Sequence, residues 1–244
     1  MAGTEELYDR MVAGLVASWE RYAEGSRGAS IQNACGAEVA IFPEGPERCV
    51  YNNAVLERGA DPARIATAVS ALEEWYPGAG IDRYAVWAHE HDRPAIAELT
   101  GRGYRLDTST RAMAMRLDGI RVPRPRLELA APDWNEYLRL LGVAEGLLAG
   151  VDPGAFHVVV ARLDGESVAT AMAYDHEGDC GIYNVLTLPR TRRRGIATAV
   201  TALLVHEARD RGCATASLQA TAIAERVYAA VGFRDLGRFL EFVR

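Results

Sequence analysis

A nine-residue segment occurs twice in this 244-residue chain, and the spacing of its copies limits what the chain can fold into. Residues 64–72 read RIATAVSAL and residues 195–203 read GIATAVTAL, so seven of nine positions are identical at an offset of 131. Flanking matches keep nearly that offset: Tyr51-Asn52 recurs as Tyr183-Asn184, and Gly103-Tyr104-Arg105 recurs as Gly232-Phe233-Arg234. A repeat of this length far exceeds a solenoid unit, so it indicates a duplicated domain.

The segment between the two copies has the composition of a linker. Residues 118–126 read DGIRVPRPR, and their two prolines lack a backbone donor and favour an extended chain before them. We therefore expect a first domain at 1–117, a linker at 118–126 and a second domain at 127–244.

The second copy shows strand and helix signals in alternation. Short β-branched runs followed by turn residues predict strands, and apolar residues at helical spacing predict helices. Strands are predicted at 157–162, 167–174, 181–188, 214–220 and 239–243, and helices after Asp133, at 196–211 and at 223–231. This order predicts an α/β sheet of mixed direction.

Charge and hydropathy exclude several classes of protein. The formal net charge is −6 and the hydrophobic fraction is 49%, which suits a folded, water-soluble chain. No stretch approaches the roughly 20 apolar residues of a membrane-spanning helix, and an acidic chain is not typical of nucleic-acid binding. We therefore expect neither a membrane nor a nucleic acid as a partner. The first residues lack the apolar core of a signal peptide, so we expect a cytoplasmic protein.

The cysteine and lysine contents of the chain limit the chemistry that it can perform. Cys35, Cys49, Cys180 and Cys213 lie far apart without a C-x-x-C pair, so we expect no metal site and read them as apolar filler. All 27 basic residues are arginine, which excludes a mechanism that needs a catalytic lysine.

Residues 188–198 (LPRTRRRGIAT) have the pattern of an anion-binding helix start. An apolar strand ends at Pro189, an arginine-rich turn follows, and a helix begins directly after Gly195. The first amides of a helix lack internal partners, and the helix dipole adds partial positive charge. Gly195 has no Cβ and lets a phosphate approach the backbone, while the Walker A and G-x-G-x-x-G patterns are both absent.

The segment resembles the Gcn5-related N-acetyltransferase (GNAT) family. That family's signature, [Gln/Arg]-x-x-Gly-x-[Gly/Ala] between a strand and a helix, is matched by Arg192-x-x-Gly195-x-Ala197. The apolar strand ending at Pro189 and the later run Ala224-x-x-Val227-Tyr228-x-x-x-Gly232-Phe233 are similar to the family's flanking blocks. The resemblance covers most of 127–244. It implies two tandem GNAT-like domains, each a mixed, mainly antiparallel sheet flanked by helices.

The resemblance implies that acetyl-CoA is the acetyl donor, with CoA as product and no metal. The backbone of Leu186, Thr187 and Leu188 would contact the pantetheine arm, and a cradle would hold the pyrophosphate. That cradle comprises Arg192, Arg193, Arg194, Gly195, Ile196, Ala197 and Thr198. Tyr228 matches a tyrosine near the cofactor sulfur and would act catalytically, by protonating the thiolate or hydrogen-bonding to it. The alternative for Tyr228 is a structural helix tyrosine. The family often has Asn where Thr221 stands, which puts a cofactor contact there in doubt.

The acceptor side is less defined by the sequence. Tyr183 and Asn184 lie on the strand that would border the acetyl group, and we expect them in the substrate pocket. The acidic residues around Glu177 are more simply a solvated turn, and His157 a core histidine. No residue stands out as the general base.

The first copy has lost the features of the cradle. Arg192, Arg193 and Gly195 align with Asp61, Pro62 and Arg64, which make a sound helix cap but a poor phosphate site. Leu99 stands in place of Tyr228. We expect a degenerate copy that keeps the fold, does not bind CoA tightly and covers the sheet edge or shapes the acceptor pocket.

The sequence therefore predicts an N-acetyltransferase that acts by direct attack in a ternary complex. Its partner would be a small-molecule or peptide amine, and a homodimer is left open. The alternatives are a non-catalytic CoA or acyl-CoA sensor or assembly module, and a generic nucleotide-phosphate binder.

Overall fold

The computed structural model describes residues 3–46, 51–144 and 146–244. Cys49 lies outside these residues. The chain divides into two compact units, each assembled from separate segments. Unit 1 comprises Met1–Ser18, Arg111–Glu145 and Asp152–Leu236, and unit 2 comprises Trp19–Thr110, Gly146–Val151 and Gly237–Arg244. The domain boundaries expected from the repeat stay a prediction.

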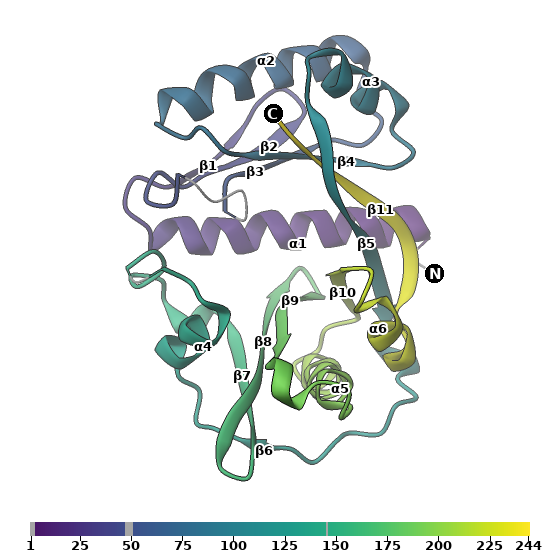
Figure 1. The fold of residues 1–244 in the computed structure, drawn as a ribbon. Helices are drawn as coiled ribbons and strands as arrows, with labels where there is room; N and C mark the ends of the chain where they lie inside the picture. The colour runs from purple at the N-terminus through teal and green to yellow at the C-terminus, as the bar shows by residue number, and fades with distance from the viewer. Residues whose placement is uncertain (1–2, 47–50, 145) are drawn as a thin grey trace. The chain divides into compact units, whose positions relative to one another are not determined.

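Unit 1 contains a sheet of mixed direction (Figure 1). Its strands in spatial order are the end of β5 (Arg105–Arg116), β10 (Thr215–Ala220), β9 (Asp179–Thr187), β8 (Glu166–His176), β7 (His157–Leu163) and β6 (Glu128–Leu129). Only β10 and β9 run parallel, and every other neighbouring pair is antiparallel. The β7–β8 and β8–β9 connections are tight turns with positive φ at Asp164 and Glu177.

Unit 1 also contains helices, some of them with capped ends. They are the start of α1 (Thr4–Glu24), α4 (Trp134–Leu141), α5 (Ile196–Asp210) and α6 (Glu225–Val231), with 3₁₀ turns η1 (Leu117–Gly119), η2 (Pro153–Ala155) and η3 (Pro189–Thr191). The Asp133 carboxylate accepts from the amides of Asn135 (2.9 Å) and Glu136 (3.2 Å), which starts α4. Gly142 ends α4 at a φ of 69°.

The two faces of the unit 1 sheet differ in polarity. Cys180, Ile182, Ala216 and Leu218 join Val200 and Leu204 of α5 in one apolar cluster. Because strand side chains alternate, Asp179, Gly181, Tyr183 and Ser217 lie on the opposite face, toward α1 and α4. Gly14 of α1 confirms this placement, since a Cβ there would lie 3.8 Å from the Tyr183 hydroxyl.

Unit 2 has its own group of strands and its own apolar cluster. Its strands are β1 (Ser30–Asn33), β2 (Ala37–Ile41), β3 (Asn53–Leu56), β4 (Ala85–His89) and the end of β11 (Arg234–Val243), and its helices include α2 (Pro62–Gly78) and α3 (Arg93–Gly101). β3 and β4 run parallel, while β2 pairs antiparallel with β1 and β3, and β4 with β11. Side chains from α2 and α3, including Val69, Leu72, Tyr76 and Leu99, bury one face of this group of strands.

The predicted elements of the second copy are present, with shifts at their ends. β11 begins at Arg234, whereas the sequence indicated a strand only from residue 239. Gly237 lies inside this strand with a φ of 103°, which is unusual for a strand residue. A Cβ at Gly237 would lie 2.4 Å from His89 Nε2, so close packing also requires glycine there.

A substitution at Gly181 tests how β9 is built. A Cβ at Gly181 would lie 2.1 Å from the Tyr183 hydroxyl and 2.5 Å from Cζ, because the tyrosine folds back over the glycine. We expect Gly181→Ala to lower the free energy of unfolding by about 1–3 kcal/mol. In a Tyr183→Ala background the same change should cost less than about 0.5 kcal/mol in chemical denaturation. An equal cost in both backgrounds would contradict the contact.

Candidate functional site

A β-bulge interrupts β9 next to β8. The register passes from Met172↔Tyr183 to Thr170↔Leu186. Between these pairs β9 advances by three residues and β8 by only two, so β9 contains one extra residue. Asn184 carries the irregularity with a φ of 55°, a left-handed conformation that asparagine tolerates better than most residues. The extra residue bends β9 at this point.

Beyond the bulge, β9 runs without β10 beside it. The parallel ladder between the two strands ends at Leu218↔Ile182, although β9 continues to Thr187. The main-chain groups of β9 that follow Tyr183 are therefore not used by β10. Leu186, Thr187 and Leu188, the predicted pantetheine contacts, lie on this segment and are half-buried. An extended ligand can add to such a strand edge through main-chain hydrogen bonds.

The start of α5 has no side-chain cap. Gly195 stands at the N-cap with a φ of 77°, and no side chain accepts from the first amides of the helix. Arg193 also has a positive φ, of 61°. Turns of this kind can direct successive amides into one concavity that suits an anion. Gly195 is exposed, and a Cβ built there would meet nothing within 4 Å, so the approach to these amides is open.

The arginines before Gly195 take different positions. The Arg192 guanidinium folds back and donates to the Thr187 carbonyl at 3.1 Å, which ties the turn to the end of β9. Arg193 and Arg194 are exposed and have no ion-pair partner among the residues that the structure describes. Ile196, Ala197 and Thr198 form the first turn of α5 and are half-buried. The structure thus gathers the predicted cradle at one helix start.

The corresponding helix start in unit 2 is closed by its own side chain. The Asp61 carboxylate accepts from the amides of Ala63 and Arg64, both at 3.0 Å, and Pro62 has no amide proton to offer. The Arg64 side chain pairs with Glu57 at 2.8 Å. An incoming phosphate would have to displace a carboxylate that already holds these donors.

Tyr228 lies on the α5 side of the unit 1 sheet. It is 6% exposed, belongs to the cluster that contains Leu218 and Ala220, and meets the Phe233 ring edge-on at 6.2 Å. Burial raises the pKa of Tyr228 to about 12. The phenol therefore stays protonated across the neutral range, in the form that can donate a proton.

Tyr183 has its hydroxyl turned away from the open end of β9. The phenol points back over Gly181, and its oxygen is buried without a hydrogen-bond partner in the described part of the chain. Burial first, and then the nearby Asp179 carboxylate, raise the pKa of Tyr183. Its ring, and not its hydroxyl, is the part available to wall a pocket.

The acidic turn after β8 is solvated only at its tip. Glu177 is exposed, but Asp179 is 2% exposed and accepts from Thr215 Oγ1 (2.6 Å) and Ser217 Oγ (2.5 Å). Burial raises the pKa of Asp179 in spite of these two bonds. The expectation of a solvated turn is therefore wrong for Asp179. His157 is also not a core residue, because its side chain is 40% exposed and lies 3.4 Å from Asp175.

Tyr137 of α4 is a site residue that the sequence did not reveal. Asn184 Nδ2 donates to its hydroxyl at 2.8 Å, so α4 contacts the bulge directly. The contact joins residues 47 positions apart, and no local pattern marks it. The helical spacing of α4 predicted only that Tyr137 would face the core.

Two polar side-chain atoms lack partners on the parts of β9 and β10 that lie beyond their shared ladder. Thr187 Oγ1 and Gln219 Nε2 are buried and make no hydrogen bond within the described residues. An unsatisfied buried polar group costs about 1–3 kcal/mol, so such groups call for a ligand, a water or a functional reason. Thr187 was predicted as a cofactor contact, whereas Gln219 was not singled out.

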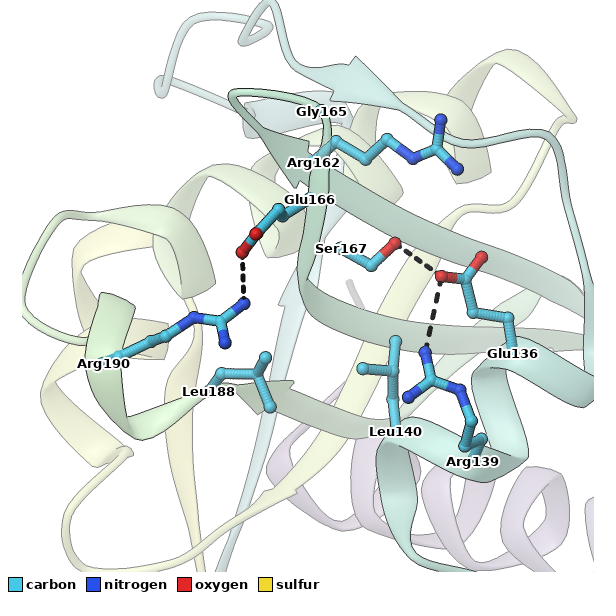
Figure 2. Close-up of a pocket in the computed structure, with 9 residues that line it drawn as sticks. All are labelled: Glu136, Arg139, Leu140, Arg162, Gly165, Glu166, Ser167, Leu188 and Arg190. Atoms are coloured by element: carbon cyan, nitrogen blue, oxygen red, sulfur yellow. Dashed lines mark hydrogen bonds and ion pairs between the residues drawn. The ribbon is translucent and has the colours of Figure 1, made fainter.

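A polar cleft of about 460 Å³ lies on the α4 side of the unit 1 sheet (Figure 2). Its lining comprises Glu136, Arg139, Leu140, Arg162, Gly165, Glu166, Ser167, Leu188 and Arg190. Figure 2 shows Glu166 reaching Arg190 (2.7 Å) and Glu136 placed between Ser167 (2.6 Å) and Arg139 (3.7 Å). Of the predicted cofactor residues only Leu188 lines it, so the cleft is distinct from the start of α5.

Comparison with known proteins agrees with this geometry. Residues 121–233 match the model of the acetyltransferase (GNAT) family. The matched segment lies in the second half of the chain and covers just under half of it. The sequence matches no curated protein.

Solved structures show the same fold over most of the chain. A GCN5-related N-acetyltransferase from Kribbella flavida is 19% identical, with a TM-score of 0.70 and coverage of 93% of this chain and 94% of that one. One from Sphaerobacter thermophilus is 18% identical, with a TM-score of 0.59 and coverage of 98% and 91%. A tandem GNAT protein from the clavulanic acid biosynthesis pathway is 12% identical, with a TM-score of 0.60 and coverage of 97% and 95%. The expected α/β GNAT-like fold with a mixed sheet is confirmed.

Two kinds of feature are absent from the described residues. None of their helices combines the length and the apolar character needed to cross a membrane. Nor do they contain three or more His, Cys, Asp or Glu side chains grouped so as to hold a metal ion.

The unsatisfied Thr187 hydroxyl predicts an unusual stability effect. Thr187→Val keeps the side-chain shape and removes an orphaned polar atom, so we expect the free energy of unfolding to rise by about 1 kcal/mol. Thr170→Val is the matched control, because the Thr170 hydroxyl donates to the Val159 carbonyl at 2.9 Å and its loss should destabilise. Urea denaturation of the ligand-free proteins measures both. Destabilisation of equal size in the two variants would refute the unsatisfied state of Thr187.

Proposed function

We propose that this protein transfers an acetyl group from acetyl-CoA to a primary amine by direct attack in a ternary complex. The amine nitrogen forms a bond to the thioester carbonyl carbon, and the carbon–sulfur bond breaks. The amine gives up a proton and the departing CoA thiolate gains one, so the products are an N-acetyl amine and free CoA. The observation that carries the proposal is the uncapped start of α5, which directly follows a strand whose edge has been left free.

The cradle and the edge of β9 would bind different parts of the cofactor. The amides from Arg193 to Thr198 would take the pyrophosphate, and the exposed Arg193 and Arg194 would add charge. The free edge of β9 around Leu186 and Thr187 would hydrogen-bond to the pantetheine arm, with the Thr187 hydroxyl as an added partner. Leu188 could contact the arm only through its side chain, because its amide donates to the Val168 carbonyl and its carbonyl accepts from Thr191. In the ligand-free protein this hydroxyl has no other use among the described residues.

Tyr228 would donate a proton to the departing thiolate. The acid must be protonated when the carbon–sulfur bond breaks, and burial keeps this phenol protonated. It lies on the α5 side of the sheet, where the cradle also begins. No cysteine lies within the matched motif blocks, so the proposal includes no covalent acetyl-enzyme.

A duplicated chain with one active copy explains the order of the elements. Three strands, a helix, a strand, a helix and a strand follow one another twice, from β1 to β5 and from β7 to β11. In unit 1, β10 pairs with the end of β5, and in unit 2, β4 pairs with the end of β11. Each copy would thus pair its last strand with a strand of the other copy. The closed helix start at Asp61 and the apolar Leu99 support a first copy that does not bind CoA.

The acceptor side of the proposal is defined by its chemistry only. A small molecule or a peptide with a free amine would bind next to Tyr183 and Asn184, and the reaction would take place in the cytoplasm. A structurally similar protein, the tandem GNAT protein from the clavulanic acid pathway, spans nearly the whole of this chain. This similarity supports a tandem arrangement and does not point to a particular acceptor.

The cradle is tested by Gly195→Asp. The change places a negative side chain at a left-handed position in front of the α5 amides, so we expect acetyl-CoA binding to weaken by about a hundredfold or more in calorimetry. Arg64→Asp, at the aligned position in α2, is the control and should leave the affinity unchanged. Loss of binding in the control would refute the account of the first copy.

The proton donor is tested by Tyr228→Phe. We expect kcat to fall by about 10²-fold while acetyl-CoA affinity is kept, because a general acid contributes at least that factor. In the wild type, kcat should rise with pH as the amine loses its proton. It should not fall through ionisation of the phenol below about pH 11, since the pKa is about 12. A wild type that binds acetyl-CoA but releases no thiol with any of a panel of amines would be a sensor.

A further inference from the structure

The side-chain amide of Asn184 is held in one orientation at the bulge. Its Nδ2 donates to the Tyr137 hydroxyl (2.8 Å), which in turn donates to the Met172 sulfur (3.5 Å). A phenol has one proton, so a hydroxyl that gives it to a thioether can only accept from the amide. This arrangement makes two hydrogen bonds, whereas the flipped amide would make one and leave the sulfur without a donor.

The hydroxyl that sets this orientation is itself immobile. Tyr137 is 1% exposed, and its ring stacks on Trp134 at a centroid distance of 5.1 Å. Trp134 stacks in turn on Phe156 at 5.7 Å. Packing of this kind fixes the ring, so the hydroxyl cannot follow a different amide rotamer without disturbing the aromatic row.

The free end of the Asn184 amide is therefore a defined acceptor. Asn184 is exposed and bonds only to Tyr137 among the described residues, which leaves Oδ1 open to solvent. The contact with Tyr137 places this side chain on the α4 side of the sheet, opposite the α5 side that holds Tyr228. An amine on the α4 side and a thiolate on the α5 side would then reach the carbonyl carbon from different directions.

We propose that Asn184 Oδ1 accepts a hydrogen bond from the attacking amine and that Tyr137 is the positioning residue that holds this oxygen in place. The inference rests on the proposed function and deepens it. A primary amine that attacks with its lone pair still has an N–H to give, whereas a thiolate has none. The site therefore selects nitrogen nucleophiles and discriminates against thiols.

Three variants of the full chain test the proposal in a thiol-release assay. Asn184→Gly suits the φ of 55° and removes the amide, so kcat/KM for the amine should fall about tenfold. Asn184→Asp keeps a free oxygen and should stay within about threefold of the wild type. Tyr137→Phe releases the amide to rotate and should give an intermediate loss, about threefold to fivefold. All three should keep the acetyl-CoA affinity.

The outcomes separate this inference from the proposed function. An unchanged kcat/KM in Asn184→Gly, or a loss of acetyl-CoA affinity in that variant, overturns the role of Oδ1. If the wild type turns over no amine, the proposed function fails, and the side-chain amide signals of Asn184 give an independent readout by NMR. These signals, assigned by their absence in Asn184→Gly, should shift when methylamine is added to the CoA-bound protein. No shift overturns the inference.

Discussion

The rest of the site depends on one extra residue in β9. The bulge between Tyr183 and Leu186 turns the strand at the point where its ladder to β10 ends, so the backbone that follows has a free edge. A regular β9 would have continued to pair with β10 and would have used the same main-chain groups internally. A strained residue persists only where its surroundings hold it. Here the strained residue is Asn184, and asparagine tolerates a left-handed conformation. Tyr137, on the packed helix α4, accepts a hydrogen bond from its side chain.

Two helix starts in one chain show how small changes decide whether an anion can bind. Both α2 and α5 present first-turn amides, and both carry the same partial positive charge from the helix dipole. In α2, the Asp61 carboxylate occupies the amides at 3.0 Å, and a proline removes another donor. In α5, Gly195 leaves the amides uncapped and the approach open. The difference follows from side-chain chemistry at three aligned positions, because both segments are helical.

Burial sets the chemical character of the polar residues in unit 1. Tyr228 and the hydroxyl of Tyr183 are buried, and burial raises the pKa of each phenol, so both phenols are protonated at neutral pH. Only Tyr228 lies on the side of the sheet where α5 begins. Asp179 is satisfied by two hydroxyls from β10 and helps to hold β9 to that strand below the bulge. Thr187 and Gln219 each keep an unsatisfied polar atom, and both lie beyond the last paired residues of the β9–β10 ladder.

Much of this molecule could be predicted from its sequence, because the deciding signals are local. Short β-branched runs and turn residues located β7 to β10 of unit 1, and the motif around Gly195 located the helix start with its uncapped amides. Three matched segments in the sequence predict a duplication. The sequence could not show that Gly237 continues a strand, that Asp179 is buried, or that Tyr137 reaches Asn184, because each depends on residues distant in the chain. A bulge is a register difference between two strands, and register exists only once the strands pair. The sequence by itself therefore determined the main strands and helices of unit 1 and the uncapped helix start at Gly195, whereas the tertiary structure decided where β9 leaves β10 and which side chains lie there.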